Sequence, residues 1–235
     1  MRRLRFKKVK HAPGFVLSIV LLSILTYLLG WSTLLAARSI VIDGTLRTGE
    51  ISSQIINPAS SFHIGEPLAR VDVHSIARRI SLLDWVEGQS VKREWLHGRL
   101  HIVIQERTPI AQFTSADGRL KLIDKNGKVF TSKGSARYPV ISFASQGDDL
   151  VATAATFVQS LPTDLLANLQ SISIRSSDFI QSSHAEMGKG NLIIRWGNCA
   201  QLGTKVKVLR ALLALPENAS AKLIDLSSPL SPIAK

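Results

Sequence analysis

The chain has 235 residues and a formal net charge of +12, from 29 Lys and Arg against 17 Asp and Glu. Six of the basic residues stand before residue 13, so half of this charge lies in a short N-terminal segment, and the remainder lacks the clustered basic and aromatic residues of a nucleic-acid binder. The single cysteine, Cys199, excludes an intrachain disulfide, so a hydrophobic core must hold the fold together.

A mostly apolar, uncharged run follows the basic segment. Residues 15–37 read FVLSIVLLSILTYLLGWSTLLAA, and as a helix they would extend about 35 Å, enough to cross a hydrocarbon core about 30 Å thick. Positively charged flanks stay on the cytoplasmic side. We therefore predict a cytoplasmic tail over residues 1–12, a transmembrane helix over 13–37 that contacts the lipid bilayer through 15–37, and a C-terminal region outside the cytoplasm. This is the type II topology of a single-pass cell-membrane protein.

A cleaved signal peptide is the main alternative to this anchor. Its basic start would look the same, but its apolar core is usually about 7 to 15 residues long and small residues precede the cleavage site. The run here is longer, and Leu34 or Leu35 stands where a small residue is wanted before Ala36–Ala37. A retained anchor is therefore favoured.

The first part of the outer region predicts the order strand, helix, helix, strand, strand. β-Branched residues before Asp43–Gly44 indicate a strand and a turn, and Asp72 stands where a helix N-cap is expected. The predicted elements are a strand over 39–42, helices over 48–56 and 72–83, and strands over 85–95 and 100–105. This order fits a two-layer α+β unit in which two helices cover one face of a sheet.

The pattern changes at Pro109, so residues 106–110 mark either a domain boundary or a bent strand. Asn126–Gly127 between two apolar runs predicts a hairpin. The remaining predicted elements are strands over 138–141, 172–174, 192–196 and 223–226, and helices over 148–161 and 199–215. This region is expected to form a second, mixed β domain with helices.

These features resemble the FtsQ/DivIB family of bacterial cell division proteins. The most specific similarity is Gln105–Phe113, which reads QERTPIAQF and is similar to the family's Glu-Arg-x-Pro-hydrophobic-Ala-x-aromatic junction. Leu122–Phe130 is similar to the family's hairpin. Gly197 and the later Lys205 are similar to the residues at the start of the family's last helix, and Ile224–Leu226 is similar to its last strand. The resemblance covers almost the whole chain.

The resemblance implies a POTRA domain (β-α-α-β-β) over residues 38–107 and an FtsQ-type β domain over 108–235, behind a single-pass membrane anchor. It also implies a non-enzymatic scaffold of the divisome at the division septum. Such a scaffold would bind FtsB/DivIC-like and FtsL-like proteins, link early and late division proteins, and regulate septal peptidoglycan synthesis. It would use no cofactor, metal, nucleic acid or small-molecule substrate.

The domain junction is one candidate site. Glu106 and Arg107, followed by Pro109, would either brace the junction by an ion pair or hydrogen bonds, or contact the anchor segment of a partner. A brace is favoured because a domain junction is partly buried, where such pairs matter more than on an open surface.

The last strand, residues 222–226, is the second candidate site. A strand at this place is expected at a sheet edge, where the two following prolines would block pairing or where a partner strand would extend the sheet by β-augmentation. The resemblance favours the partner strand. Leu226, Ser228 and Ile233 are the predicted partner-binding residues.

Charged residues on the helix over 199–215 are predicted to be a solvated face and not a binding site, since apolar residues on the same helix would pack inward. They are Lys205, Lys207 and Arg210.

Catalytic and metal-binding patterns are weak. His97 and His101 are four residues apart, but Gly98 and the strand pattern argue against one helical face, and no third ligand stands nearby. His184 is expected in a polar loop. No phosphate-binding loop or nucleophile motif occurs. A membrane-anchored cell-wall enzyme and a secreted binding module are the alternatives to the scaffold.

Overall fold

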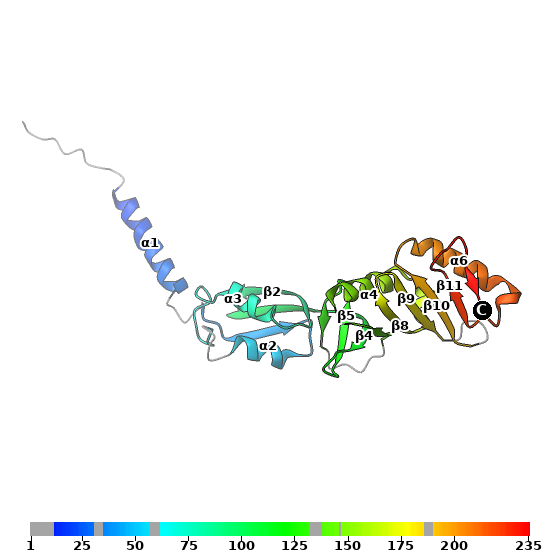
Figure 1. Cartoon of the computed structure of the whole chain (residues 1–235). Helices are drawn as coiled ribbons and strands as arrows, with labels where there is room; N and C mark the ends of the chain where they lie inside the picture. The colour runs from blue at the N-terminus through cyan, green and yellow to red at the C-terminus, as the bar shows by residue number, and fades with distance from the viewer. Residues whose placement is uncertain (1–11, 31–34, 57–61, 132–137, 146, 186–189) are drawn as a thin grey trace, which may run out of the picture. The chain divides into compact units, whose positions relative to one another are not determined.

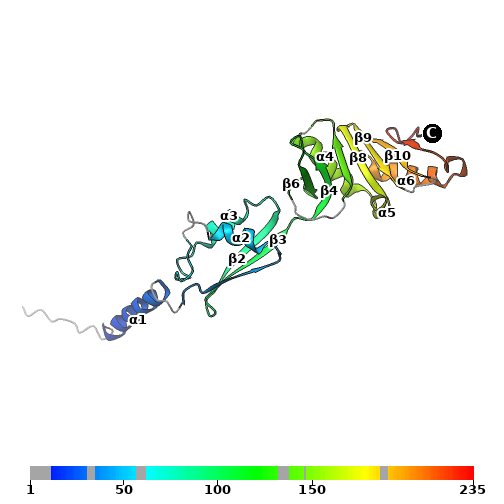
Figure 2. The same cartoon turned by 90° about the horizontal axis from the view of Figure 1, so that it is seen from below.

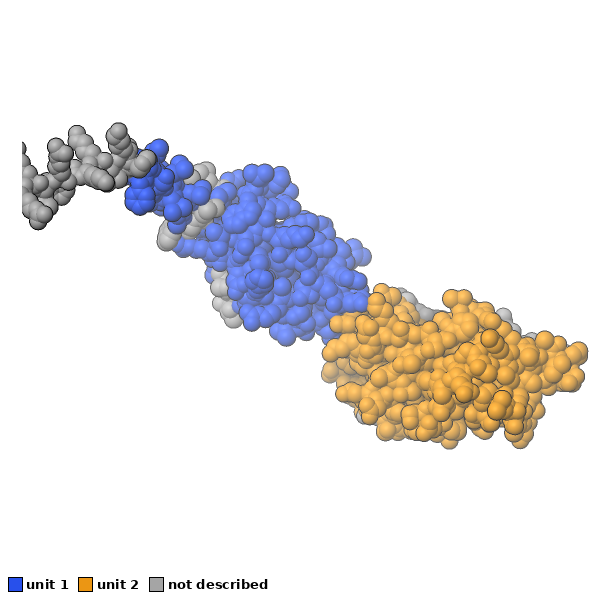
Figure 3. Space-filling model, turned by 90° about the horizontal axis from the view of Figure 1, so that it is seen from above, with its two compact units in different colours: residues 1–106 blue, residues 107–235 orange. Residues whose placement is uncertain are grey.

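The computed structural model describes residues 12–30, 35–56, 62–131, 138–145, 147–185 and 190–235. The chain divides into two compact units, Met1–Glu106 and Arg107–Lys235, which Figure 3 shows in different colours. The basic segment before residue 12 and residues 31–34 of the predicted transmembrane helix lie outside the described residues.

The first helix, α1, covers Ala12–Gly30 and overlaps the predicted span (Figure 1). Its side chains from Phe15 to Tyr27 are exposed and mostly apolar. Within the described residues, no helix combines the length and the apolar character that crossing a membrane requires.

The first unit contains a three-stranded sheet with two helices on one face (Figure 2). The strand order is β1-β3-β2, with β1 parallel and β2 antiparallel to β3. The elements are β1 Ser39–Asp43, α2 Thr48–Ile55, α3 Val73–Ile80, β2 Val86–Glu94 and β3 Arg99–Glu106. This confirms the predicted order strand, helix, helix, strand, strand.

The start of α3 shows how local sequence sets this fold. The Asp72 carboxylate accepts hydrogen bonds of 3.0 Å from the backbone N–H groups of His74 and Ser75, which satisfies two donors of the first helical turn. From there Ile76 and Ile80 point into the core, where they meet the inward-facing residues of the sheet. The N-cap and the helical spacing together place the apolar stripe against the sheet.

The second unit is a nine-stranded mixed sheet with helices on one face. The strand order is β12-β11-β10-β9-β8-β7-β4-β5-β6. Its strands are β4 Pro109–Thr114, β5 Leu120–Asp124, β6 Val129–Phe130, β7 Val140–Phe143, β8 Leu169–Ser176, β9 Phe179–His184, β10 Leu192–Gly197, β11 Leu223–Asp225 and β12 Ile233–Ala234. Its helices are α4 Asp148–Ser160, α5 Thr163–Ala167, α6 Leu202–Ala214 and the 3-10 turn Pro216–Asn218.

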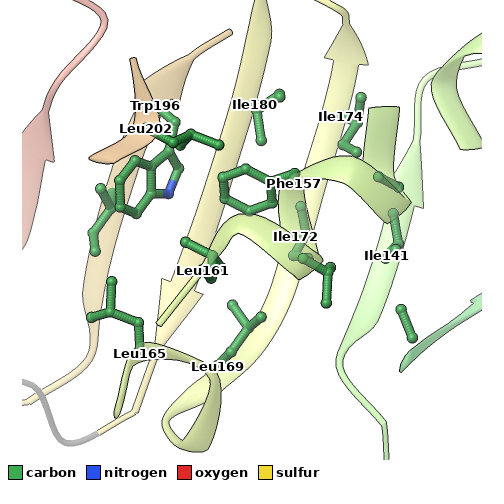
Figure 4. Close-up of a cluster of buried hydrophobic side chains, with 14 of the residues drawn as sticks. Ile141, Phe157, Leu161, Leu165, Leu169, Ile172, Ile174, Ile180, Trp196 and Leu202 are labelled. Carbon is green, nitrogen blue, oxygen red and sulfur yellow. The ribbon is translucent and has the colours of Figure 1, made fainter. Parts of the chain in front are cut away.

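The core of this unit lies between the sheet and the helices (Figure 4). Phe157 of α4 and Trp196 of β10 meet edge to face, with ring centroids 5.6 Å apart and planes at 65°. Leu161 and Ile180 pack around this pair. The aromatic contact joins the helix layer to the middle of the C-terminal half of the sheet.

Strand β9 and helix α5 are among the elements of the second unit that were not predicted. Strand β9 was missed because its inward-facing residues are Ile180, Ser182 and His184, so two of the three buried positions are polar and the apolar alternation disappears. The prediction that His184 lies in a polar loop is therefore wrong. The five-residue helix α5 was missed because Pro162 reads as a stop, whereas it is the residue that precedes the next helix.

Candidate functional site

The C-terminal edge of the large sheet differs from the prediction. Residues 223–225 form β11, which lies between β10 and β12 and is therefore not an edge strand. The chain reverses after Leu226 through a turn in which Ser231 N–H donates to Ser228 O over 3.0 Å. It then adds Ile233–Ala234 antiparallel to β11, so the prediction that the last strand is residues 222–226 is wrong by one strand.

Strand β12 presents backbone groups at the open edge. Lys235 N–H donates to Leu223 O over 2.9 Å, and Leu223 N–H donates to Lys235 O over 3.0 Å. In an antiparallel ladder, pairs that exchange hydrogen bonds alternate with pairs that do not, so the N–H and C=O of Ala234 point away from β11. Among the described strands, none lies on that side.

The three predicted partner-binding residues lie in different surroundings. The Leu226 side chain is fully buried in the core, so it is not available to a partner. Ser228 is exposed in the turn, and Ile233 of the edge strand is 52% exposed. Sequence reasoning missed Leu230, which is 93% exposed in the same turn. An apolar residue between two prolines was the available signal.

The face of the sheet opposite the helices carries an ion pair next to this edge. Arg195 Nη1 donates to Asp225 Oδ2 over 2.9 Å, and the Arg195 guanidinium lies 5.7 Å from the ring centre of Phe179. Partial burial acts to raise the pKa of Asp225, but hydrogen bonds from Ser227 and the Arg195 guanidinium hold it below the ordinary value. Ile233 is paired with Asp225, so its side chain extends the same face.

A buried lysine binds the end of β10 from the helix side. Lys205 of α6 is almost fully buried, and its Nζ donates to Trp196 O over 2.7 Å and to Asn198 O over 2.9 Å. Burial lowers its pKa from the ordinary value. The prediction that Lys205 lies on a solvated face is wrong, because these carbonyl groups at the end of β10 need a donor that the helix supplies.

The other two charged residues of α6 behave as predicted. Lys207 is exposed, and Arg210 makes a two-pronged ion pair with the exposed Asp164 at 3.0 and 2.9 Å. An exposed pair of this kind contributes little to stability.

Gly197 allows the end of β10 to lie close to the turn after β11. Its φ of 71° is one that side chains rarely adopt, and a Cβ placed there would lie 3.1 Å from the Cα of Ser227. Gly197 and Lys205 therefore both act at the end of β10, where the backbone leaves the strand.

The junction residues are each bound within their own unit. The Glu106 carboxylate accepts a hydrogen bond from the Thr45 hydroxyl in the first unit. Arg107 pairs with Asp124 in the second unit at 2.5 Å, and Asp124 is buried and also accepts from the backbone N–H groups of Asn126 and Lys128. Pro109 is the first residue of β4. Glu106 and Arg107 therefore stabilise the ends of two separate sheets.

Three buried side chains of the second unit form a chain of hydrogen bonds that ends at Leu165 O. The indole N–H of Trp196 donates to Ser182 Oγ over 2.7 Å, and Ser182 Oγ lies 2.8 Å from His184 Nε2. His184 Nδ1 lies 3.2 Å from Leu165 O, so the bonds assign the proton of the neutral ring to Nδ1. Burial lowers the pKa of His184 to about 4. All three side chains lie in the core, so the arrangement is structural.

His101 lies on the open face of the first sheet, and His97 lies in the turn between β2 and β3. His101 Nε2 is 2.8 Å from Asp43 Oδ2, and His101 Nδ1 is 3.3 Å from Glu94 Oε1. His97 is 3.8 Å from the other oxygen of Glu94. In the part of the chain that the structure describes, no three His, Cys, Asp or Glu side chains are arranged to hold a metal ion.

Comparisons with known proteins match both units. Residues 35–107 match the model of the POTRA domain of FtsQ type, and residues 113–227 match that of the C-terminal region of cell division protein FtsQ/DivIB. A cell division protein FtsQ of Mycobacteroides abscessus is 29% identical over 228 residues, covering 94% of this chain and 69% of that protein. One of Streptomyces bingchenggensis is 28% identical over 222 residues, covering 88% and 78%.

A structural likeness is weaker. The extracytoplasmic domain of the division protein DivIB from Geobacillus stearothermophilus matches 38% of this chain and 78% of its own, at 16% sequence identity. Its TM-score of 0.29 is too low to support an argument about the fold.

Proposed function

Since the chain belongs to the FtsQ/DivIB family of cell division proteins, we propose that it is a non-enzymatic scaffold of the division machinery. Its function in this proposal is to bind other division proteins at the septum and to link early and late components. Through them it regulates septal peptidoglycan synthesis. The work is done by binding, with no turnover of substrate.

The proposal includes a membrane anchor in the segment predicted over residues 13–37, with the N-terminus in the cytoplasm. The predicted end of that segment is wrong, because Ala36 and Ala37 are buried in the first unit and Ala37 N–H donates to Glu66 O. The charge pattern of the sequence supports it, because basic residues precede an uncharged apolar run and no acidic residue occurs before Asp43. The side chains of α1 from Phe15 to Tyr27 are mostly apolar and exposed. This topology puts both sheet units outside the cytoplasm.

The partner site in this proposal is the outer edge of β12. The observation that carries it is the outward direction of the N–H and C=O of Ala234, at an edge that no described strand covers. A strand of an FtsB/DivIC-like or FtsL-like partner would pair with these groups by β-augmentation. Ile233 on the open face, with Ser228 and Leu230 in the turn, would supply the side-chain contacts.

This edge lies beyond residue 227, where the match to the family's C-terminal region ends. The proposal therefore depends on the geometry of this chain and not on a transferred residue. A two-residue strand alone offers few backbone bonds, so exposed apolar side chains must contribute to affinity.

The test is co-purification of the FtsB/DivIC-like and FtsL-like proteins of the same cell with the full chain and with a variant that ends at Pro232. That end point removes β12 but keeps the buried Leu226, so the core is retained. Capture by the full chain and loss of capture by the shortened chain are expected. Equal capture would move the site away from β12, and no capture by a folded full chain would contradict the scaffold.

The size of the mature chain distinguishes a secreted binding module from the anchored scaffold. Removal of residues 1–37 would contradict the anchor and leave only the outer region. The cell-wall enzyme needs an accessible nucleophile and base, whereas the Ser182–His184 contact is buried beneath α5.

A further inference from the structure

Three segments of the first unit meet where the chain enters it. Arg38 N–H donates to Gly98 O over 2.7 Å, which ties the chain to the hairpin between β2 and β3. Ala37 N–H donates to Glu66 O over 2.8 Å, and Gly65 N–H donates to Ala37 O over the same distance. The hairpin tip at 95–98 and the loop at 63–66 therefore flank Ala37 and Arg38, the last residue of the apolar run and the first residue after it.

Gly98 makes this approach close. Its φ is 60°, and a Cβ at this position would lie 2.7 Å from Ala36 O and 3.2 Å from Arg38 Cγ. Only a glycine allows the hairpin tip to lie directly against residues 36–38. The position of the tip beside the entry point is thus fixed by backbone contacts inside one unit.

The two flanking loops expose large apolar side chains. Leu96 is 96% exposed at the hairpin tip, and Ile64 and Trp95 are also exposed. The guanidinium of Arg93 lies 6.0 Å from the ring centre of Trp95. Tryptophan and arginine side chains are suited to the boundary between water and lipid, because each combines an apolar body with a polar end.

The sheet has opposite charges at its two ends. The strand ends beside the entry point carry the basic residues Arg38, Arg93 and Arg99. The opposite strand ends carry the acidic residues Asp43, Glu87 and Glu106. Two acidic residues also lie at the first end. Glu94 is engaged by His101 at 3.3 Å, and Glu66 lies in the flanking loop, so this end keeps a net positive charge. The basic end complements an anionic surface, and the acidic end would be repelled by one.

We infer that the entry end of the first unit docks on the surface of an anionic lipid bilayer, with Trp95 and Leu96 entering the interface and Arg38 and Arg99 meeting headgroups. This inference rests on the membrane anchor of the proposed function, because the apolar run leads into residues 36–38 and brings this end to the bilayer. The docked tip would hold the first unit in one orientation on the membrane.

The test is a fluorescence measurement on the full chain in lipid vesicles. Cys199 is replaced by Ser, and a single cysteine is introduced by His97→Cys at the hairpin tip and labelled with an environment-sensitive dye. The matched control is Leu46→Cys, because Leu46 is fully exposed in the same unit but follows the opposite end of β1. Vesicles contain phosphatidylglycerol and phosphatidylcholine, or phosphatidylcholine alone, with nitroxide-bearing lipid as the quencher.

Several-fold stronger quenching at position 97 than at position 46 is expected in the anionic vesicles. Leu96→Asp and Arg99→Glu are each expected to reduce the quenching at position 97. Equal, weak quenching at both positions in vesicle-bound protein would overturn the docking but leave the anchor in place. Failure of the protein to associate with vesicles would overturn both.

Discussion

The ammonium group of Lys205 lies 2.7 Å from the carbonyl oxygen of Trp196, so a charged residue of α6 is tied to the end of the buried strand β10. The same ammonium group also binds Asn198 O. Here the backbone leaves the strand through Gly197, which turns it away from the regular ladder. A surface-type residue thus supplies the donors that this irregular backbone needs in the core.

Replacing Lys205 should therefore destabilise the second unit. Lys205→Met keeps most of the side-chain volume but leaves two carbonyl groups without their donor, at an expected cost of about 3 kcal/mol in the free energy of unfolding. Urea unfolding measures this loss. The control is Lys207→Met on the same helix, which is exposed and should change stability by less than about 0.5 kcal/mol. Similar effects of both variants would contradict the structural role of Lys205.

His184 should make the second unit sensitive to mild acid. Its pKa is about 4 in the folded chain, against an ordinary value of 6.5, so the unfolded chain binds more protons between these values. Stability from the neutral ring is complete above pH 6.5 and is lost as the pH falls towards 4. The loss is expected to reach about 3 kcal/mol.

The measurement is the difference in unfolding free energy between the parent chain and His184→Gln across this pH range. The variant removes the titrating group but keeps a side chain that can donate and accept hydrogen bonds. The difference should change with pH between 6.5 and 4 and be constant above 7. A difference that does not vary with pH would show that the ring is not held neutral by the fold.

Arg107→Ala should destabilise the start of the second unit through Asp124. Removal of the guanidinium leaves a buried carboxylate, at an expected cost of about 3 kcal/mol. Arg119→Ala is the matched control, since its pair with Asp117 is exposed and should be worth less than about 0.5 kcal/mol. Hydrogen exchange of the β5–β6 hairpin reports the effect locally. Unchanged protection in Arg107→Ala would contradict a stabilising role for the Arg107–Asp124 ion pair.

Gly98→Ala should destabilise the first unit because of its positive φ and its contact with Ala36 O. The expected cost is about 2 kcal/mol. Gly49→Ala in α2 is the control and should stabilise the first unit. A Cβ there has no atom within 4 Å, and alanine is more favourable than glycine in a helix by about 0.5 to 1 kcal/mol. Thermal unfolding of both variants decides the prediction. A neutral Gly98→Ala would mean that the hairpin tip can separate from residues 36–38.

Elements with strong local signals could be predicted from the sequence. The capped, one-faced helix α3 and the Asn126–Gly127 hairpin follow directly from residue spacing and turn chemistry. Each depends on residues close together in the chain. The POTRA order of the first unit is a succession of such local signals.

Features that depend on distant contacts could not be predicted in this way. Strand β9 buries Ser182 and His184 because Trp196 and Leu165 supply their hydrogen bonds, and these partners are invisible in the local pattern. Lys205 is buried for the same reason. Strand β12 was missed because a two-residue strand has no periodicity, so the sheet edge was assigned one strand too early.

The most direct test of partner binding at β12 removes one backbone N–H group from this edge. Ala234→Pro deletes the N–H that points away from β11, and an edge strand tolerates proline when the lost N–H faces outward. Ala234→Ser is the control, because it keeps this N–H. Capture of the FtsB/DivIC-like partner by full-length protein should be strongly reduced in Ala234→Pro and retained in Ala234→Ser. Equal capture by the two folded variants would contradict partner-strand addition at β12.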